Sequence, residues 1–569
     1  MKLIIREYLA SLRERNELDA LLPDLLSQMG LDVFSKPSAG PREYGVDIAA
    51  IGSIDGGEET VYLFSVKSGD LGRTDWNGGS VQALRPSLDD ILDTYIPTHL
   101  PAEYKGKPIE ICLCFGGSIK VTVRQDITSY KNRYTTEDIK FSEWNGEKLA
   151  NYIEKFLLRE ELLPKNCRPL LRKSLALLDE PETSYVHFSQ LVRSLSNVEY
   201  EKQEDTLTAI RQLYISLWIL YAWCREQNNL ESVYLASEIT ALHAWDIGKP
   251  YFNKNKKLDR SILEALTAIL NLHIQISSEF VELKVFPYAD KLYALSSAVY
   301  PSCAVDVNLK LFDILGRVAL SGVWSYWYLH RIQNVEENSA LINNAIARYK
   351  KHQEVLIQLI VNNPVLFTPY KDDQAIDITL AAWFLSLDEY NHSNLKGWLS
   401  NMMDAAYYNL SIDSSYPCNL QSYYELIEHP QNSKKGYLEE VTAGSILYPT
   451  IAMFSAMFDF DETYSVVQKI KTDFLEHCNF QVWYPNNISE ENFYNNGKNH
   501  GSAFSQISID DNKNNFLDSL FNECDESPQF NQLSAITTQH WPLIMMACRH
   551  YRLPVPIHFL RDLHRPLED

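Results

Sequence analysis

Residues 45–69, GVDIAAIGSIDGGEETVYLFSVKSG, have the pattern of a β-hairpin. A short apolar run over 45–51 is followed by a turn with two adjacent glycines, which tolerate positive φ. The run over 60–67 is rich in β-branched and aromatic residues, as strands are. Because strand side chains alternate between faces, Ser65 and Lys67 are expected on the same side of the second strand.

Two charged residues stand out in this hairpin. Asp47 lies in the first predicted strand and Lys67 ends the second. Packing does not explain them, because burying either charge without a partner costs several kcal/mol. A divalent cation explains both, since the carboxylate would hold the metal and the ammonium would steady an attacking water or a phosphate. The hairpin therefore predicts a metal-dependent site that joins two adjacent strands.

The residues of this site carry a resemblance to a known family. Asp47, followed by Ser65-Val66-Lys67 and preceded by a predicted helix that carries Glu17, resembles the PD-(D/E)xK nucleases of the restriction-endonuclease-like fold. The similarity covers residues 1–165 and is greatest to the branch found in bacterial anti-phage proteins. One position departs from the family pattern: the second acid of the motif, two residues before the lysine, is Ser65 here. That departure favours one tightly held metal ion over two.

The resemblance implies an Mg²⁺-dependent (or Mn²⁺-dependent) endodeoxyribonuclease. Its catalytic residues would be Asp47, Lys67, Ser65 and Glu17, and its metal ligands Asp47, the carbonyl of Val66, and Glu17. Alternatives from the same part of the chain stay open. Glu14 and Asp19 compete with Glu17, and Glu43 and Asp70 compete for the place of the missing acid.

Net charge limits the classes of partner. The chain carries −22, which argues against a general nucleic-acid coat. Residues 1–165 hold 20 Lys and Arg against 26 Asp and Glu, a balance of −6, so the remainder carries −22 + 6 = −16. A DNA substrate would therefore rely on local basic clusters, each of which is otherwise solvated surface. These clusters are Arg13/Arg15, Arg73, Arg85, Lys105/Lys107, Lys120/Arg124 and Lys131/Arg133.

Several common classes of site have no signature in this sequence. The nine cysteines are odd in number and scattered, which predicts reduced thiols and a cytoplasmic location. No signal peptide or membrane-spanning segment is expected. There is no phosphate-binding P-loop motif, and no two histidines have the spacing of a zinc hydrolase.

The order of predicted elements divides the chain. Residues 1–165 read as a helix, three strands, a helix and further strands, an α/β core of the restriction-endonuclease type. From about Pro164 helical periodicity dominates, so a large all-α array, an irregular α-solenoid, is expected. We expect three domains: residues 1–165, a first helical lobe over 166–365, and a second over 366–569. Residues 484–531 are polar and predict a long loop.

The function expected from this reading is a DNA-cleaving effector of anti-phage defence. Its helical region would sense a phage protein or bind a partner defence subunit, and the protein would act as a homo-oligomer away from membranes. Two alternatives stay open: a catalytically degenerate scaffold that binds proteins, and an RNase. The aromatic clusters at 324–328 and 540–541 are expected to pack between helices, or else to form a concave face that grips a peptide.

Overall fold

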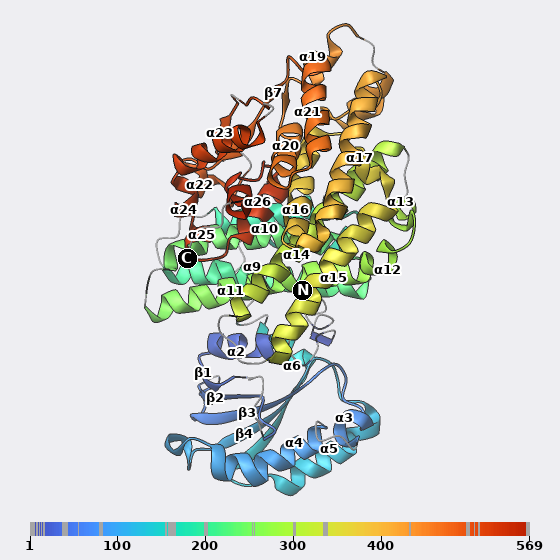
Figure 1. Ribbon diagram of the computed structural model, residues 1–569. Coiled ribbons are helices and arrows are strands. Elements are labelled where there is room, and N and C mark those ends of the chain that lie inside the picture. The colour runs from blue at the N-terminus through green and yellow to red at the C-terminus, as the bar shows by residue number, and fades with distance from the viewer. Residues whose placement is uncertain are drawn as a thin grey trace. The chain divides into compact units, whose positions relative to one another are not determined.

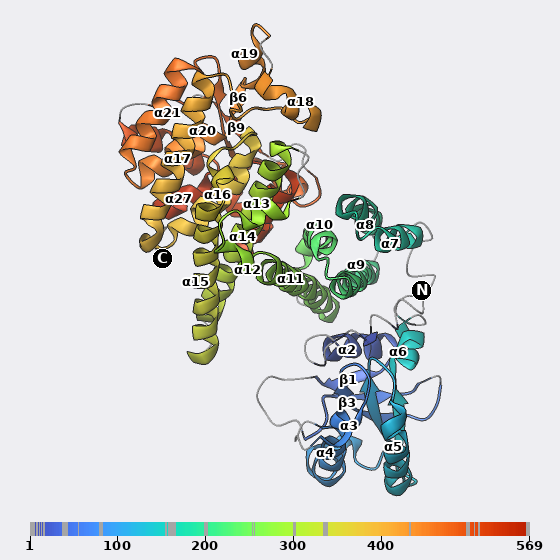
Figure 2. The same ribbon diagram turned by 90° about the vertical axis from the view of Figure 1, so that its right-hand side faces the viewer.

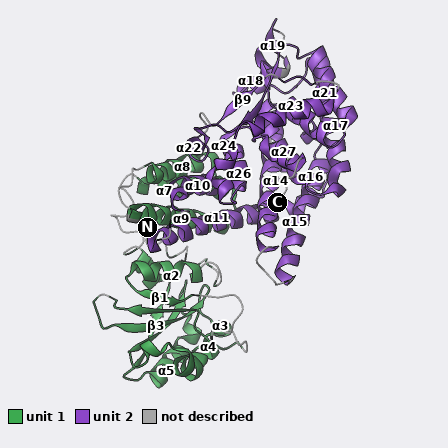
Figure 3. Cartoon of the chain, turned by 60° about the vertical axis from the view of Figure 1, so that its left-hand side comes forward, with its two compact units in different colours: residues 1–236 green, residues 237–569 purple. Residues whose placement is uncertain are grey.

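The computed structural model describes most of the chain. It covers residues 18–36, 44–54, 56–78, 83–153, 167–197, 203–252, 256–299, 303–333, 339–431, 434–496, 501–505, 507–509 and 512–564, with single residues 6, 9, 10, 12, 14, 156 and 254. The chain forms two compact units, residues 1–236 and 237–569, which Figure 3 distinguishes by colour. This boundary lies inside helix α10 and not at 165/166 or 365/366. The three-part division therefore stays a prediction about independently folding domains.

Unit 1 contains a five-stranded mixed sheet in the order β1-β2-β3-β4-β5. The strands are β1 Asp32–Ser35, β2 Ile48–Gly52, β3 Thr60–Lys67, β4 Ile109–Phe115 and β5 Ile139–Trp144. The first three are antiparallel, whereas β3, β4 and β5 run parallel. Parallel strands need a crossover connection, and the helices between β3 and β5 supply it.

The central strand β3 has the predicted bounds, and its residues after Thr60 are all buried. A strand covered on both faces favours the near-continuous apolar run that this segment has. The partner strand β2 differs from expectation, because it begins at Ile48 and leaves Asp47 just outside the ladder. Asp47, the candidate metal ligand, is thus the residue directly before the strand.

Helices cover both faces of the sheet (Figures 1 and 2). On one face, Leu63 of β3 and Leu113 of β4 form a core with Trp76, Leu88 and Ile127 from the helices. On the other face, Phe64 packs edge-to-face on Trp144. The helices that surround the sheet are α2 Asp19–Gln28, α3 Arg73–Asn77, α4 Leu84–Asp90, η2 Ile91–His99, η3 Ala102–Tyr104, α5 Val121–Tyr134 and α6 Gly146–Tyr152.

Three elements of this region lie in stretches with a weak or mixed pattern. The glycine-rich segment after β3 contains helix α3. The segment that follows Lys120 is helix α5. Helix α2 spans Asp19–Gln28 and includes Pro23 as its fifth residue, so the helix lacks the backbone N–H bond of that position.

Glycines draw the loops together at the carboxyl ends of the parallel strands. A Cβ at Gly116 would lie 1.8 Å from the Leu9 carbonyl, and one at Gly146 would lie 2.0 Å from the Gly116 carbonyl. The Gly117 N–H donates to the Gly69 carbonyl at 2.9 Å. The N-terminal segment therefore passes directly over the end of β4, which no larger residue at position 116 would permit.

The rest of unit 1 and the whole of unit 2 are mainly helical. Unit 1 continues with α7 Cys167–Ala176, α8 Pro181–Ser196, α9 Gln203–Glu226 and the start of α10 Glu231–Gly248. Unit 2 has the helices α11 Lys257–Lys284, α12 Phe286–Ala289, α13 Ala294–Ala298, α14 Ala304–Gln333, α15 Ser339–Asn362, α16 Ala375–Ser386, α17 His392–Ser411, α18 Tyr423–Glu428, α19 Tyr437–Val441, α20 Leu447–Met457, α21 Asp461–Asp473, α22 Ser489–Asn492, α23 Lys513–Asp525, α24 Gln529–Gln532, α25 Ser534–Thr537, α26 Pro542–Tyr551 and α27 His558–His564. Short 3₁₀ segments join some of them: η5 Lys249–Tyr251, η6 Pro364–Phe367, η7 Asp372–Gln374, η8 Glu389–Asn391 and η9 His429–Gln431.

Unit 2 also contains short strands that the sequence did not predict. Strand β6 Gly444–Ser445 pairs with β7 Asn479–Phe480, and β8 Val482–Tyr484 pairs with β9 Ser502–Phe504. The polar stretch 484–531, in which a long loop is expected, also contains β9 and helix α23. Pairs of two or three residues leave too little periodicity for sequence reasoning to detect.

Helix α16 lies at the centre of unit 2, with every residue buried. An apolar surface all round is typical of such a helix. Two glycines of the neighbouring helix α14 permit the contact: a Cβ at Gly322 would lie 2.4 Å from the Phe384 ring, and one at Gly316 would lie 2.0 Å from Asp377 Oδ1. Helix α14 also packs against α11, α15 and α26.

A buried network of charges ties four helices of unit 2 together. Arg549 of α26 bonds Glu238 of α10 at 2.6 Å and Asp313 of α14 at 2.5 Å, while Arg552 bonds Asp377 of α16 at 2.7 Å. Burial alone would raise the pKa of Glu238, but the positive charge of Arg549 and the hydrogen bond from His550 lower it to about 2. The Glu238 carboxylate therefore stays charged inside the unit. Burial instead raises the pKa of Asp377, against the opposing effect of Arg552 and Arg549.

Two further observations concern the whole chain. No disulfide joins any of the nine cysteines, all of which lie in the described ranges. Over the same described part of the chain, none of the helices combines the length and the apolar character that crossing a bilayer requires.

We predict that Gly316→Ala lowers the free energy of unfolding by about 3 kcal/mol, because the new methyl group must displace Asp377 from the buried network. Gly397→Ala is the matched control on helix α17, where a Cβ meets nothing within 4 Å. The control should be more stable than wild type by about 1 kcal/mol. Urea unfolding followed by tryptophan fluorescence checks both. Equal stability of the two variants would contradict the tight contact between α14 and α16.

Candidate functional site

Asp47 lies beside the end of strand β3. The ladder pairs Ile48 with Phe64, so its next step brings Asp47 opposite Ser65. The Asp47 N–H donates to the Phe64 carbonyl at 2.9 Å, and its Oδ2 accepts from the Val66 N–H at 2.6 Å. The carboxylate is thus held against the backbone of β3, one residue before Lys67. Hydrogen bonding to a charged carboxylate is stronger than to a neutral acceptor, which favours this placement.

Lys67 is the last residue of β3, and only 9% of it is exposed. Its Nζ lies 3.0 Å from Glu14 Oε1. Removing an ammonium from water costs several kcal/mol, and a close carboxylate offsets part of that cost. Glu14 comes from the N-terminal segment that passes over Gly116, so the close approach at that glycine also brings the acid to the lysine.

Ser65 is fully buried between these groups along the strand. Its Oγ has no hydrogen-bond partner among the described residues. A buried hydroxyl left in this state costs about 1–3 kcal/mol, and such groups commonly mark a bound water or ion. The hydroxyl is therefore an available oxygen ligand at the place where the nuclease motif has its second acid.

The structure brings together most of the residues predicted from the sequence. Asp47, Ser65, Val66 and Lys67 meet at one end of β3. Glu17 lies outside the described residues, as does Glu43. Of the alternatives, Glu14 has the position beside Lys67, whereas Asp70 accepts a hydrogen bond from the Ser118 N–H at 2.7 Å and fastens a loop.

The donor atoms at this site suit a hard divalent cation. The Asp47 carboxylate, the Val66 carbonyl and the Ser65 hydroxyl all offer oxygen, which Mg²⁺ and Mn²⁺ prefer. Within the described ranges, no three His, Cys, Asp or Glu side chains converge as a metal-binding group. Mg²⁺ is often held by one or two carboxylates together with waters and substrate phosphates. The residues present fit that kind of site, with Asp47 as its carboxylate; Glu14, which pairs with Lys67, is a further acid at this strand end.

The basic clusters fall into two groups. Lys131 and Arg124 both pair with Glu143, at 2.9 and 3.6 Å, and Lys107 pairs with Glu59. Arg13 and Arg15 lie outside the described residues. Arg73, Arg85 and Arg133 form no ion pair within the described chain, and they line one cavity of about 560 Å³. Sequence reasoning named these arginines separately but had no signal that they converge.

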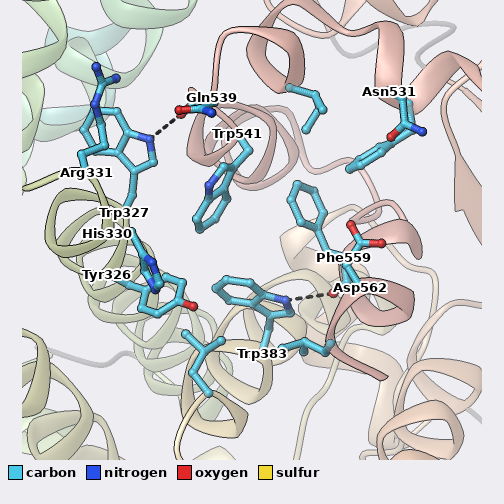
Figure 4. A pocket seen from close by; sticks show the side chains of 14 residues that line it. Tyr326, Trp327, His330, Arg331, Trp383, Asn531, Gln539, Trp541, Phe559 and Asp562 are labelled. Carbon is cyan, nitrogen blue, oxygen red and sulfur yellow. Dashed lines mark hydrogen bonds between the residues drawn. The ribbon is translucent and has the colours of Figure 1, made fainter. Parts of the chain in front are cut away.

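A second site is an aromatic pocket in unit 2, with a volume of about 490 Å³ (Figure 4). Rings from several helices surround it. The Trp383 and Trp541 centroids are 5.3 Å apart, and Tyr326 is 6.1 Å from Trp383. The lining residues are Tyr326, Trp327, His330, Arg331, Trp383, Leu387, Phe530, Asn531, Ile536, Gln539, Trp541, Phe559, Asp562 and Leu563.

Two indole N–H groups of this aromatic pocket already form hydrogen bonds with backbone carbonyls. The indole N–H of Trp327 donates to the Gln539 carbonyl at 2.6 Å, and that of Trp383 donates to the Phe559 carbonyl at 3.1 Å. Burial lowers the pKa of His330, which keeps its imidazole neutral. The pocket therefore presents mainly apolar ring surface. The sequence reading treated Trp541 as a packing residue; the structure shows that it also lines this pocket.

We predict that Glu14→Gln lowers the free energy of unfolding by about 1–3 kcal/mol, because it leaves the Lys67 ammonium without a counter-charge in a largely buried place. Glu59→Gln is the matched control, since Glu59 is 59% exposed and exposed pairs contribute little. Its effect should stay within about 0.5 kcal/mol. Chemical unfolding checks both variants, and an equal effect would contradict a structural role for the Lys67–Glu14 pair.

Comparison with protein-family models, curated proteins and solved structures gives no match for this chain.

Proposed function

We propose that residues 1–165 form a metal-dependent nuclease that hydrolyses phosphodiester bonds in DNA. The observation that supports it best is that the buried Lys67 ends β3 while the Asp47 carboxylate is bonded to the N–H of Val66, the residue before Lys67. Three antiparallel strands followed by two parallel ones are also the arrangement that a restriction-endonuclease-like core requires. The helical remainder, proposed to be an irregular α-solenoid, would serve sensing or assembly.

The roles of the side chains follow from their chemistry. Asp47 and the Val66 carbonyl would hold Mg²⁺ or Mn²⁺, with Ser65 as a further oxygen. When bound, this ion neutralises the scissile phosphate and lowers the pKa of a water. Lys67 carries a fixed positive charge within reach of the same strand end, where it would stabilise the negative charge that develops on the phosphate oxygens. Burial makes this charge more effective than a solvated one.

Glu14 gives the site a second state. The Glu14 carboxylate pairs with the Lys67 ammonium in the structure, so a phosphate that approaches Lys67 would compete with Glu14. A displaced Glu14 would stand next to the metal position as a second acid. This exchange would let one residue stabilise the lysine without substrate and support the metal with it.

The setting proposed for this activity, restriction of phage DNA by an oligomeric effector, comes from the family resemblance of the Asp47 and Ser65-Val66-Lys67 positions. The same resemblance supplies Glu17 as a further ligand. A catalytically degenerate scaffold and an RNase remain the alternative proposals.

We predict that the full-length protein cleaves supercoiled or linear DNA with Mg²⁺ or Mn²⁺ and not with EDTA. Asp47→Asn and Lys67→Met should each reduce the rate by about 100-fold or more, the usual effect of removing one group that stabilises the transition state. Asn can still accept the Val66 N–H, so the first variant tests the charge and preserves the local fold. Gel electrophoresis of the products measures the rate.

Lys140→Met serves as the control, because Lys140 is exposed and pairs in the ladder with Glu110, at the opposite end of β4 from Phe115, the partner of Lys67. Cleavage by Asp47→Asn at the wild-type rate would refute the proposed site. Cleavage of RNA but not DNA would establish the RNase alternative. If the protein cleaves neither supercoiled DNA, linear DNA nor RNA, the nuclease proposal is refuted and the scaffold alternative replaces it.

The aromatic pocket favours a second function, recognition of a partner polypeptide by unit 2. A cavity of about 490 Å³ has the size of pockets that bury a ligand group. With the indole N–H groups of Trp327 and Trp383 bonded to the backbone, the walls offer ring faces to an aromatic or aliphatic anchor. We propose that one such side chain of a partner enters this pocket.

We predict that the apolar fluorophore 1-anilinonaphthalene-8-sulfonate binds this pocket and that peptides with a central Trp or Phe displace it. Leu387→Arg, which places a charge on the pocket wall, should weaken its binding at least about tenfold. Tyr424→Leu is the control, because Tyr424 is 78% exposed and lies outside the pocket. Fluorescence titration measures the affinity. Equal binding by both variants, or no displacement by aromatic peptides, would contradict this function.

A further inference from the structure

The cavity at Arg73, Arg85 and Arg133 lies among three helices on one side of the sheet, and it is separate from the end of β3. Helices α3, α4 and α5, which supply its residues, lie together in Figure 1. The remaining lining residues are Trp76, Asn77, Asp126, Ser129, Tyr130 and Tyr134. Three arginines against Asp126 give the lining a balance of 3 − 1 = +2. This balance contrasts with a chain that carries −22 overall.

The three guanidinium groups differ from the other cations nearby. On the same helix as Arg133, both Arg124 and Lys131 form an ion pair with Glu143. Within the described residues, Arg73, Arg85 and Arg133 have neither an ion pair nor a hydrogen bond. An exposed arginine by itself is solvated surface. Three that converge on one cavity without a carboxylate partner have their planar donor groups available for an anion, and phosphate matches that geometry.

Aromatic rings form the floor and rim of this arginine cavity. Trp76 and Tyr130 are buried and meet edge-to-face at 5.5 Å. The Tyr130 hydroxyl donates to Asp89 at 2.6 Å, and burial together with this hydrogen bond raises its pKa, so the ring stays a neutral surface. Tyr134, 4.6 Å from Tyr130, is 38% exposed at the rim. An exposed tyrosine ring beside arginines is a stacking platform for a nucleobase.

From these observations we infer that the arginine cavity binds a phosphorylated nucleoside. The phosphate would lie among the guanidinium groups, and the base would stack on Tyr134. The Asp126 carboxylate would accept hydrogen bonds from ribose hydroxyls or an exocyclic amine. A bare phosphate would use the arginines but leave the ring at the rim without contact. The same chemistry is present in a free nucleotide and at the phosphorylated end of a nucleic-acid strand. This inference does not depend on hydrolysis at Asp47.

The test is isothermal titration calorimetry of the full-length protein with three probes: ATP, a 5′-phosphorylated oligothymidylate and orthophosphate. ATP or the phosphorylated oligonucleotide should bind more tightly than orthophosphate, and affinity should fall as salt rises. Arg85→Gln and Arg133→Gln should each weaken binding about tenfold or more, since each removes a charged hydrogen-bond donor. Tyr134→Ala should weaken binding of the nucleotide but not of orthophosphate, and Tyr134→Phe should restore it.

Arg124→Gln is the matched control on helix α5, because Arg124 already pairs with Glu143 and lies outside the cavity lining. Comparing the free nucleotide with the oligonucleotide decides which source the site prefers. Wild-type affinity in both arginine variants, equal weakening by Arg124→Gln, or no binding of any probe would overturn the inference. Equal affinity for orthophosphate and ATP would overturn its nucleoside part. Binding that survives in Asp47→Asn separates this site from the proposed nuclease centre.

Discussion

The ion pair between Lys67 and Glu14 is the interaction on which the end of the sheet depends. Placing a lysine side chain at the end of a central strand with 9% exposure carries a desolvation cost, and a nearby carboxylate offsets part of it. The N-terminal segment supplies that carboxylate, and it reaches the lysine because Gly116 lets it pass over β4. The loops after the parallel strands, the position of Asp47 and the pairing of Lys67 are therefore parts of one arrangement. Any chemistry at this strand end must begin by competing with Glu14.

Unit 2 also holds charged side chains in its interior, and there they connect several helices. Its buried carboxylates and arginines connect α10, α14, α16 and α26, and the glycines of α14 leave room for them. The rings that surround the aromatic pocket come from α14, α16, α24 and α27 and from Trp541, which directly precedes α26. Two of these helices, α14 and α16, also take part in the charge network and in the close contacts at Gly316 and Gly322. Close packing of this kind favours rigid pocket walls.

Local pattern was enough to predict the hairpin, its second strand and the gathering of Asp47, Ser65, Val66 and Lys67. Each follows from alternation and from the turn residues between the strands. The pattern could not predict Glu14 as the partner of Lys67, because Glu14, Glu17 and Asp19 lie close together in the sequence and local pattern does not distinguish them. Helix α3 was missed because its five residues lie among glycines, where a short helix and a loop read alike.

By itself, the sequence determined that an apolar hairpin carries one acid and one lysine, that helices follow it, and that one position of the motif holds serine. These are properties of neighbouring residues, and neighbouring residues set strand alternation and helical period. Only the tertiary structure decided which distant groups meet: Glu14 with Lys67, Arg73 with Arg85 and Arg133, and Trp383 with Trp541. Such meetings depend on how whole elements pack, and no spacing along a single chain encodes that.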